Sequence, residues 1–257
     1  MRSALIGFTG FVGSNLDRQH GFDDKFNSRN IGAIEAKSYD LVVCAGVQAK
    51  KWWANEHPAE DWAAITSLLD RLAHVQADRF VLVSTVDVYP HPRGVDETTV
   101  PDETANHAYG RHRYQVEEFV RERFPNHLVL RLPGLFGPGL KKNVIFDLLT
   151  DNNLEKINPD GSYQYYDLGE LWGDLSRLMA TDIRLINFAT APLTTREIID
   201  AFFPGKDVGG QAGPAGSYDF RTIHADRFGG QAGYLKSQAQ VRERLGRFID
   251  YWKAGGR

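Results

Sequence analysis

Apolar residues along the first half of the chain gather in short runs, and amphipathic segments separate these runs. The runs are rich in Val, Ile and Leu without polar alternation, which is typical of strands buried on both faces of a parallel sheet. In the segments between them, apolar residues recur at helical spacing. This alternation predicts βαβ units and an α/β fold. The expected strands are 2–7, 40–45, 79–84 and 127–132, and the expected helices are 11–17, 60–75 and 109–124.

After about residue 133 the pattern changes, because glycine and proline become frequent and the apolar segments become shorter. We therefore expect a core over residues 1–140, to which later segments return, and a smaller region with a C-terminal helix over residues 141–257. The elements expected in this part are helices at 143–150, 167–179, 194–202 and 237–252, a strand at 184–188 and a glycine-rich loop at 204–217.

The composition of the chain excludes several classes of protein. The 257 residues carry 30 Lys and Arg against 33 Asp and Glu, and a net charge of −3 gives no basic field for nucleic acid or anionic membranes. No apolar run approaches the roughly 20 residues of a membrane span, and the first residues lack the pattern of a secretory signal. The single cysteine, Cys44, excludes an internal disulfide, and the histidines show no metal-ligand spacing. We expect a cytoplasmic protein without a metal site.

A glycine-rich turn follows the first expected strand. Gly7, Gly10 and Gly13 form the pattern G-x-x-G-x-x-G, and a helix is expected to start at Phe11 and Val12. Such a turn needs residues that tolerate positive φ, and a diphosphate must approach bare backbone. The free N–H groups and the positive end of the helix then hold the negative charge. This arrangement predicts a dinucleotide-binding turn.

The adenosine side of such a site is usually completed after the second strand, about 20 residues further on, by an acid that binds the ribose 2′-hydroxyl. Here Ser28 and Arg29 occupy that position. A guanidinium and a hydroxyl suit a 2′-phosphate, which favours NADP over NAD. Alternatively, a shifted strand brings Asp24 into the position and reverses this preference.

Two pairs of polar residues are candidates for catalysis. Ser84 and Thr85 end an expected strand, and the carboxyl ends of parallel strands face the ligand crevice. Tyr109 and Arg113 lie four residues apart on an expected helix, so they share one face. A nearby cation favours the tyrosinate, so we expect a lowered Tyr109 pKa and a phenol that exchanges protons with a sugar oxygen.

The chain contains five short motifs in a fixed order, namely GFTGFVG at 7–13, CAG at 44–46, STVDVY at 84–89, YGRHRYQVE at 109–117 and RLPGLFGPG at 131–139. This is the order found in extended short-chain dehydrogenases/reductases, and the sequence resembles this NAD(P)-dependent epimerase/dehydratase family over about residues 1–140. The resemblance implies a Rossmann-type, doubly wound parallel sheet with a small C-terminal substrate-binding cap.

The resemblance also implies roles for individual residues. Thr85 would hold the substrate oxygen, Tyr109 would be the acid/base, and Ala45 and Gly46 would line the adenine side of the cofactor. Residues from Pro133 to 136 would lie near the nicotinamide. Family members often dimerise through the helices that correspond to 60–75 and 109–124, which implies a homodimer.

The sequence departs from the family at two catalytic positions. Arg113 stands where the family has a lysine, and arginine is effectively never deprotonated, although it can still hold the nicotinamide ribose. Val86 and Asp87 stand where the dehydratases have an acidic pair, so sugar dehydration is not expected. Three further side chains are candidates for contact with substrate, namely Asp87, Lys142 and Arg221.

Together these features predict an NAD(P)-dependent oxidoreductase or epimerase that acts on a sugar or nucleotide sugar by hydride transfer. The alternative is a dinucleotide-binding protein of the same fold with weak or no catalysis, because Arg113 replaces the family lysine. A small aldehyde or lactone is a further substrate class, since the expected cap is short.

Overall fold

The computed structural model describes residues 2–256, and the chain divides into two compact units. The chain crosses between the units more than once. The first unit comprises Met1–Pro90, Thr99–Arg131 and Glu170–Ile186, and the second comprises His91–Thr98, Leu132–Gly169 and Asn187–Arg257. The first unit thus includes residues up to 131 and takes in residues 170–186 later in the chain, and the short segment 91–98 belongs to the second unit.

The central sheet has six strands in the order β2-β1-β3-β4-β5-β9, and the pairs β1–β2, β1–β3 and β3–β4 are parallel. The strands are β1 (Ser3–Ile6), β2 (Asp24–Phe26), β3 (Ser38–Cys44), β4 (Gln76–Thr85), β5 (His127–Leu132) and β9 (Leu185–Asn187). The order runs outward in both directions from β1. The carboxyl ends of β1 and β3, where the order reverses, are where such sheets bind ligands.

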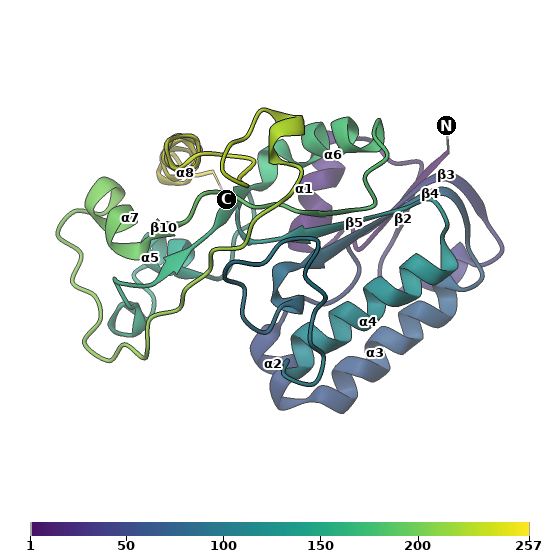
Figure 1. The fold of residues 1–257 in the computed structure, drawn as a ribbon, viewed down its shortest axis with the longest axis horizontal. Coiled ribbons are helices and arrows are strands. Elements are labelled where there is room, and N and C mark those ends of the chain that lie inside the picture. Colours follow the sequence, from purple (N-terminus) through teal and green to yellow (C-terminus); the bar gives the residue numbers. More distant parts are fainter. Residues whose placement is uncertain (1, 257) are drawn as a thin grey trace. The chain divides into compact units, whose positions relative to one another are not determined.

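Helices cover both faces of this sheet, which confirms the doubly wound, Rossmann-type α/β fold. In Figure 1, α3 and α4 lie side by side on one face, and α1 and α6 lie together on the other. The helices of the first unit are α1 (Phe11–Gln19), α2 (Lys51–Glu56), α3 (Pro58–Leu72), α4 (Ala108–Arg123) and α6 (Leu171–Met179). The sequence pattern did not predict α2, because six residues are too short to show helical periodicity.

Two short sheets and three helices form the second unit. Strand β6 (Gly134–Phe136) pairs in parallel with β8 (Tyr165–Asp167), and β7 (Ser162–Tyr163) pairs antiparallel with β10 (Leu193–Thr194). The helices are α5 (Val144–Thr150), α7 (Thr195–Phe202) and α8 (Gln238–Lys253). Single 3₁₀ turns occur in both units, at η1 (Ile31–Ile34), η2 (Val86–Val88), η3 (Leu154–Lys156), η4 (Leu168–Glu170) and η5 (Ala225–Phe228).

The predicted apolar runs form the core of the first unit. Leu5, Val42, Val81 and Val129 are fully buried in β1, β3, β4 and β5. Cys44 is also fully buried, and burial raises its pKa to about 11, so it packs as a small apolar side chain. Among residues 2–256, no helix combines the length and the apolar character needed to cross a membrane.

Candidate active site

The turn after β1 can be made only with glycine. Gly7 has a φ of +85°, and a Cβ atom there would overlap the carbonyl oxygen of Ala45. A Cβ atom on Gly13 would overlap the carbonyl oxygen of Gly7. A third close approach involves Gly46, whose Cβ would lie 2.8 Å from Cγ2 of Ile6. The ends of β1 and β3 and the start of α1 are therefore packed backbone against backbone.

The start of α1 is left open for an anion. Gly10 is the N-cap residue, no side chain caps the helix, and its first turn holds no acid. The first hydrogen bond of the helix runs from Ser14 N–H to the Gly10 carbonyl. The N–H groups of Phe11, Val12 and Gly13 precede this bond, so they have no intrahelical acceptor and lie at the positive end of the helix dipole. This geometry fits the diphosphate of a dinucleotide.

Changing Gly13 to alanine is expected to destabilise the protein by about 1–3 kcal/mol and to weaken dinucleotide binding, because the new methyl group forces the Gly7 carbonyl away. Thermal unfolding and calorimetry with NADH and NADPH measure the two effects. Gly21→Ala is the control, since nothing lies within 4 Å of a Cβ there, and its effect should stay within about 0.5 kcal/mol. A Gly13→Ala variant as stable and as tightly binding as the parent contradicts the expectation.

The loop after β2 carries Ser28 and Arg29, both exposed, with the Arg29 N–H bound to Oδ1 of Asn27 at 2.9 Å. Asp24 lies instead at the start of β2. Its carboxylate accepts hydrogen bonds from the Tyr39 hydroxyl at 2.7 Å and from Arg2 at 2.9 Å. These bonds, with that of Tyr39 the stronger, hold the Asp24 pKa below its ordinary value. Asp24 is therefore engaged elsewhere, and the shifted strand is not the arrangement observed.

Thr85 and Tyr109 come together at the carboxyl end of β4. The Thr85 hydroxyl oxygen accepts a hydrogen bond from the Asp87 N–H at 3.1 Å, and this bond caps η2. The Thr85 side chain also makes a hydrogen bond with the Tyr109 phenol that favours the phenolate. Tyr109 is only 7% exposed in the first turn of α4, where its N–H donates to Oδ1 of Asn55 at 3.0 Å. The predicted pair of hydroxyl groups is thus present.

Arg113 lies against Tyr109, but its charge is committed elsewhere. Its Nη1 and Nη2 atoms donate to the two carboxylate oxygens of Asp61 at 2.6 and 2.8 Å, and Nη2 also donates to the Gln48 carbonyl at 2.5 Å. The guanidinium stacks 4.0 Å from the centroid of the Tyr109 ring. Its terminal nitrogens thus bind Asp61 and backbone carbonyls, while its buried Nε has no hydrogen-bond partner among the described residues, and the ribose-binding role expected for Arg113 stays a prediction.

The pKa of Tyr109 is raised to about 12, whereas the helical spacing predicted a lowered pKa. Burial of the phenol is the largest cause, and it outweighs the favourable charge of Arg113. The negative charges of Asp87 and Asp61 raise the pKa further. The prediction was wrong because spacing along a helix shows the neighbouring cation and does not show the depth of burial.

Sequence reasoning missed three charged or titratable neighbours of this pair. Asp61 could have been noticed, because it shares a face of α3 with the buried Ile65. A carboxylate on a buried face needs a buried cation or hydrogen-bond donor as its partner. Lys51 in α2 binds Oδ1 of Asp87 at 2.9 Å. His107 caps α4, since its Nδ1 accepts from the Gly110 N–H at 3.0 Å, and burial, then Lys51, lower its pKa. No local sequence pattern indicated that Lys51 and His107 lie near Thr85 and Tyr109.

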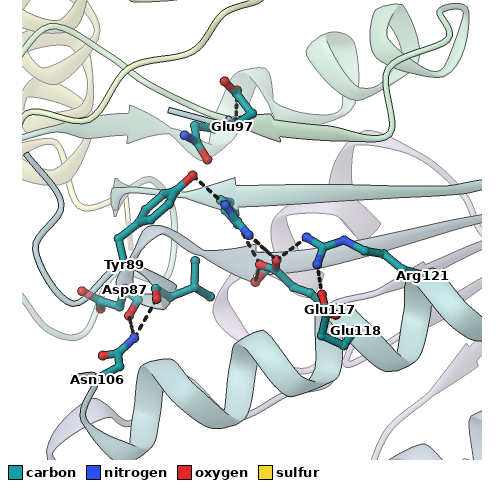
Figure 2. A network of polar contacts seen from close by, with 11 residues as sticks. Asp87, Tyr89, Glu97, Asn106, Glu117, Glu118 and Arg121 are labelled. Atoms are coloured by element: carbon teal, nitrogen blue, oxygen red, sulfur yellow. Dashed lines mark hydrogen bonds and ion pairs between the residues drawn. The ribbon is translucent and has the colours of Figure 1, made fainter. Parts of the chain in front are cut away.

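Ser84 belongs to a buried ion-pair network instead of the Tyr109 pair. Its hydroxyl donates to Oε1 of Glu117 at 2.5 Å. Glu117 is fully buried on α4, where it also binds Arg131 at 2.6 Å and, nearer the surface, Arg121 at 2.8 Å (Figure 2). Arg131 in turn donates to the hydroxyl of Tyr89 at 2.6 Å. The Ser84 hydroxyl therefore has a buried carboxylate as its partner, and the catalytic role expected for Ser84 stays a prediction.

The remaining candidates lie in the second unit. Pro133 follows β5 directly, and Lys142 is exposed just before α5. Arg221 donates to both carboxylate oxygens of Asp219 at 3.2 and 3.3 Å and to the Ala232 carbonyl at 2.8 Å. Their roles toward cofactor or substrate stay predictions. Within residues 2–256, no group of His, Cys, Asp and Glu is arranged to hold a metal ion.

Comparisons with known proteins show the family and the fold of this chain. A family model described as the NAD dependent epimerase/dehydratase family matches residues 23–176. A search of curated protein sequences found no match. Among solved structures, a UDP-glucose 4-epimerase of Thermotoga maritima, determined with UDP-glucose, has a TM-score of 0.76 and 16% identity, with 99% of each chain covered.

Two other solved structures share the fold. A dTDP-4-dehydrorhamnose reductase from Bacillus anthracis, in complex with NADP, has a TM-score of 0.74 and 16% identity, with 97% of each chain covered. A UDP-N-acetylglucosamine 4-epimerase from Methanobrevibacter ruminantium, in complex with UDP-N-acetylmuramic acid, has a TM-score of 0.74 and 14% identity, with 99% of this chain and 98% of that chain covered. At such identities the likeness shows the fold alone.

Proposed function

The chain belongs to the NAD dependent epimerase/dehydratase family, and on that premise we propose that it is an NAD(P)-dependent oxidoreductase or epimerase acting on a sugar or nucleotide sugar. The observation that carries this proposal is the pair of Thr85 and Tyr109 at the carboxyl edge of the sheet. The glycine turn that begins at Gly7 follows β1 at the same edge. One crevice can therefore serve both a dinucleotide and a substrate.

The residues present fit a nicotinamide dinucleotide. The N–H groups of Phe11, Val12 and Gly13 would bind its diphosphate, and Ala45 and Gly46 would line the adenine side. When bound, such a cofactor supplies or accepts a hydride. The protein's part is to place the substrate oxygen between Tyr109, which donates or accepts its proton, and Thr85, which orients it. Among the predicted substrate contacts, Asp87 lies beside this pair, where Lys51 binds its carboxylate.

The loop after β2 favours NADP, because it offers a guanidinium and a hydroxyl and its nearest acid is engaged elsewhere. Arg29→Ala is expected to weaken NADPH binding about tenfold or more, since hydrogen bonds to charged groups contribute about 1.5–3 kcal/mol. Binding of NADH, which lacks the phosphate, should not change. Calorimetry with both coenzymes measures the difference, and equal losses for the two would contradict it.

The direct test of the function is an absorbance assay of nucleotide sugars with NADH or NADPH. Consumption or production of the reduced coenzyme would support the proposed function. A purified protein that binds neither coenzyme would contradict it. The second candidate is a dinucleotide-binding protein without catalysis, which the engagement of Arg113 by Asp61 favours. Binding without turnover on any substrate identifies that case. The proposal also includes four further expectations. The protein would form a homodimer, it would be located in the cytoplasm, Pro133 would lie beside the nicotinamide, and Lys142 and Arg221 would contact the substrate.

A further inference from the structure

We propose that two arginine side chains near the amino end of β4 form a second binding site, which takes a phosphate group. The cations are Arg79 in β4 and Arg184, which directly precedes β9, and Asn126, which directly precedes β5, lies between them. These residues all belong to the first unit. The site is separate from the candidate active site and does not depend on the proposed function, because Arg79 and Thr85 lie near opposite ends of β4.

A single amide oxygen joins the two guanidinium groups. Nη1 of Arg79 and Nη1 of Arg184 both donate to Oδ1 of Asn126. The orientation of this amide is fixed, because its Nδ2 atom donates to the Asp78 carbonyl oxygen at 2.7 Å. The Asn126 backbone is held as well, since its carbonyl oxygen accepts from the Phe80 N–H at 3.1 Å. The structure therefore brings two cations to one neutral acceptor.

Neither guanidinium is neutralised by an acid. Within residues 2–256, neither Arg79 nor Arg184 forms an ion pair with a carboxylate. Nη2 of Arg79 donates to the Ile183 carbonyl oxygen at 3.3 Å, and its buried Nε atom has no hydrogen-bond partner in that same range. By contrast, the buried Arg131 binds the carboxylate of Glu117 at 2.6 Å. Two like charges thus lie side by side without the anion that would offset their repulsion.

The positive field of this cluster reaches its neighbours. Burial, and then the charge of Arg184, lower the pKa of Arg79. Burial is also the largest cause of the lowered pKa of His127, the first residue of β5, and a hydrogen bond with the Phe124 carbonyl opposes it. The charges of Arg121, Arg184 and Arg79 lower the His127 pKa further. His127 therefore lies close enough to sense a charge that binds between the two arginines.

A phosphate group fits this arrangement better than a singly charged anion does. It carries up to two negative charges and several acceptor oxygens, and guanidinium groups bind such oxygens in pairs. Arg184 is exposed, and its Nε and Nη2 atoms have no acceptor among the described residues, so both can donate to a ligand that arrives from solvent. Arg79 is partly buried, which strengthens its attraction for an anion.

Binding can be measured at His127 without coenzyme or substrate. The ring resonances of the histidines are recorded by NMR, and His127→Gln identifies the signal of His127. Inorganic phosphate is then added at constant ionic strength, with chloride as the reference salt. We expect a saturable shift of the His127 signal with phosphate alone. An equal response to both salts overturns the site. Phosphate at the glycine turn does not affect this readout, since that turn lies at the other end of the sheet.

Arg184→Gln is expected to weaken phosphate binding about tenfold or more, because it removes a charged donor from the site. The exposed position of Arg184 keeps the fold unaffected. The matched control is Arg177→Gln, which also removes one positive charge from the first unit, but one that Asp174 pairs at 3.5 Å. Its phosphate affinity should stay within about twofold of the parent value. Equal affinities of Arg184→Gln and the parent protein overturn the proposal.

Asn126→Asp supplies the missing negative charge from within the chain. The new carboxylate would lie between Arg79 and Arg184, so we expect the response of His127 to phosphate to disappear. A folded Asn126→Asp protein that binds phosphate as tightly as the parent overturns the proposal. Where this variant does not fold, Arg184→Gln decides.

The source of the phosphate group is distinguished with a phosphate ester. Ribose 5-phosphate is titrated beside inorganic phosphate, with the same His127 signal as the readout. Tighter binding of the ester supports a phosphorylated metabolite as the ligand, and equal binding supports the free anion. A shift with neither compound overturns the site, whereas the proposed function is judged separately by coenzyme binding and turnover.

Discussion

Tyr109→Phe is expected to lower turnover by about 10²–10⁴-fold, the usual contribution of a general acid or base. The phenol oxygen is the group beside Thr85 that can exchange a proton with substrate, and the phenyl ring keeps the packing against Arg113. Coenzyme affinity should stay within about twofold, because the glycine turn that would bind the diphosphate is untouched. Steady-state kinetics and calorimetry on the same preparation measure the two quantities.

Tyr114→Phe is the matched control for this experiment. Tyr114 lies on the same helix, and the Arg121 guanidinium lies 5.6 Å from the centroid of its ring. Removing its hydroxyl group should leave turnover unchanged. If Tyr109→Phe keeps the activity of the parent protein, Tyr109 is not the acid/base, and the assignment of the site to the Thr85 and Tyr109 pair is wrong.

Arg131→Met is expected to destabilise the protein by about 3–5 kcal/mol, because it leaves the Glu117 carboxylate buried beside an apolar side chain. Glu117 is 0% exposed and Arg131 is 1% exposed. Three hydrogen bonds between Arg131 and Glu117, at 2.6–3.1 Å, join β5 to α4, the helix that carries Tyr109 (Figure 2). Urea unfolding followed by circular dichroism gives the free energy of unfolding.

Arg121, a second partner of Glu117, provides the control for this experiment. Arg121 also binds Glu117, at 2.8 Å, but its side chain is 26% exposed, so water can replace it. Arg121→Met should therefore cost at most about 1 kcal/mol. The double variant Arg131→Met with Glu117→Leu should recover much of the loss, since no unpaired charge remains. Equal losses for Arg121→Met and Arg131→Met would show that burial does not govern this network.

Most strands of the first unit could be predicted because they contain a run of buried residues, such as Leu41 to Cys44 in β3. Strand β2 was not predicted, because only one of its three residues is buried. Helices with an apolar stripe, such as α3 and α8, could be predicted from the helical spacing of their apolar residues, and α8 begins with a full capping box at Ser237. The positive φ at Gly7 could also be predicted from the local sequence, since glycine is the residue that tolerates it.

Features that depend on distant partners could not be predicted. Arg113 is 52 residues from Asp61, and no local pattern joins them. For the same reason Ser84 resembled a catalytic hydroxyl, although its partner Glu117 lies 33 residues away. The sign of the Tyr109 pKa shift depended on burial by α3 and η2, which a helical spacing within α4 does not contain. A hydroxyl or charge at a promising position therefore needs its long-range partner before a role can be assigned.

The bidentate bond between Arg113 and Asp61 also restricts how this protein can vary over time. An isolated change at position 61 leaves the buried Arg113 guanidinium without its carboxylate, and an isolated change at position 113 leaves the buried Asp61 carboxylate with His112 as its remaining partner, 2.8 Å away. The charges at positions 61 and 113 are therefore expected to change together during evolution. A lysine at position 113 would keep a cation beside Asp61, whereas an uncharged residue there would leave the buried carboxylate with His112 alone.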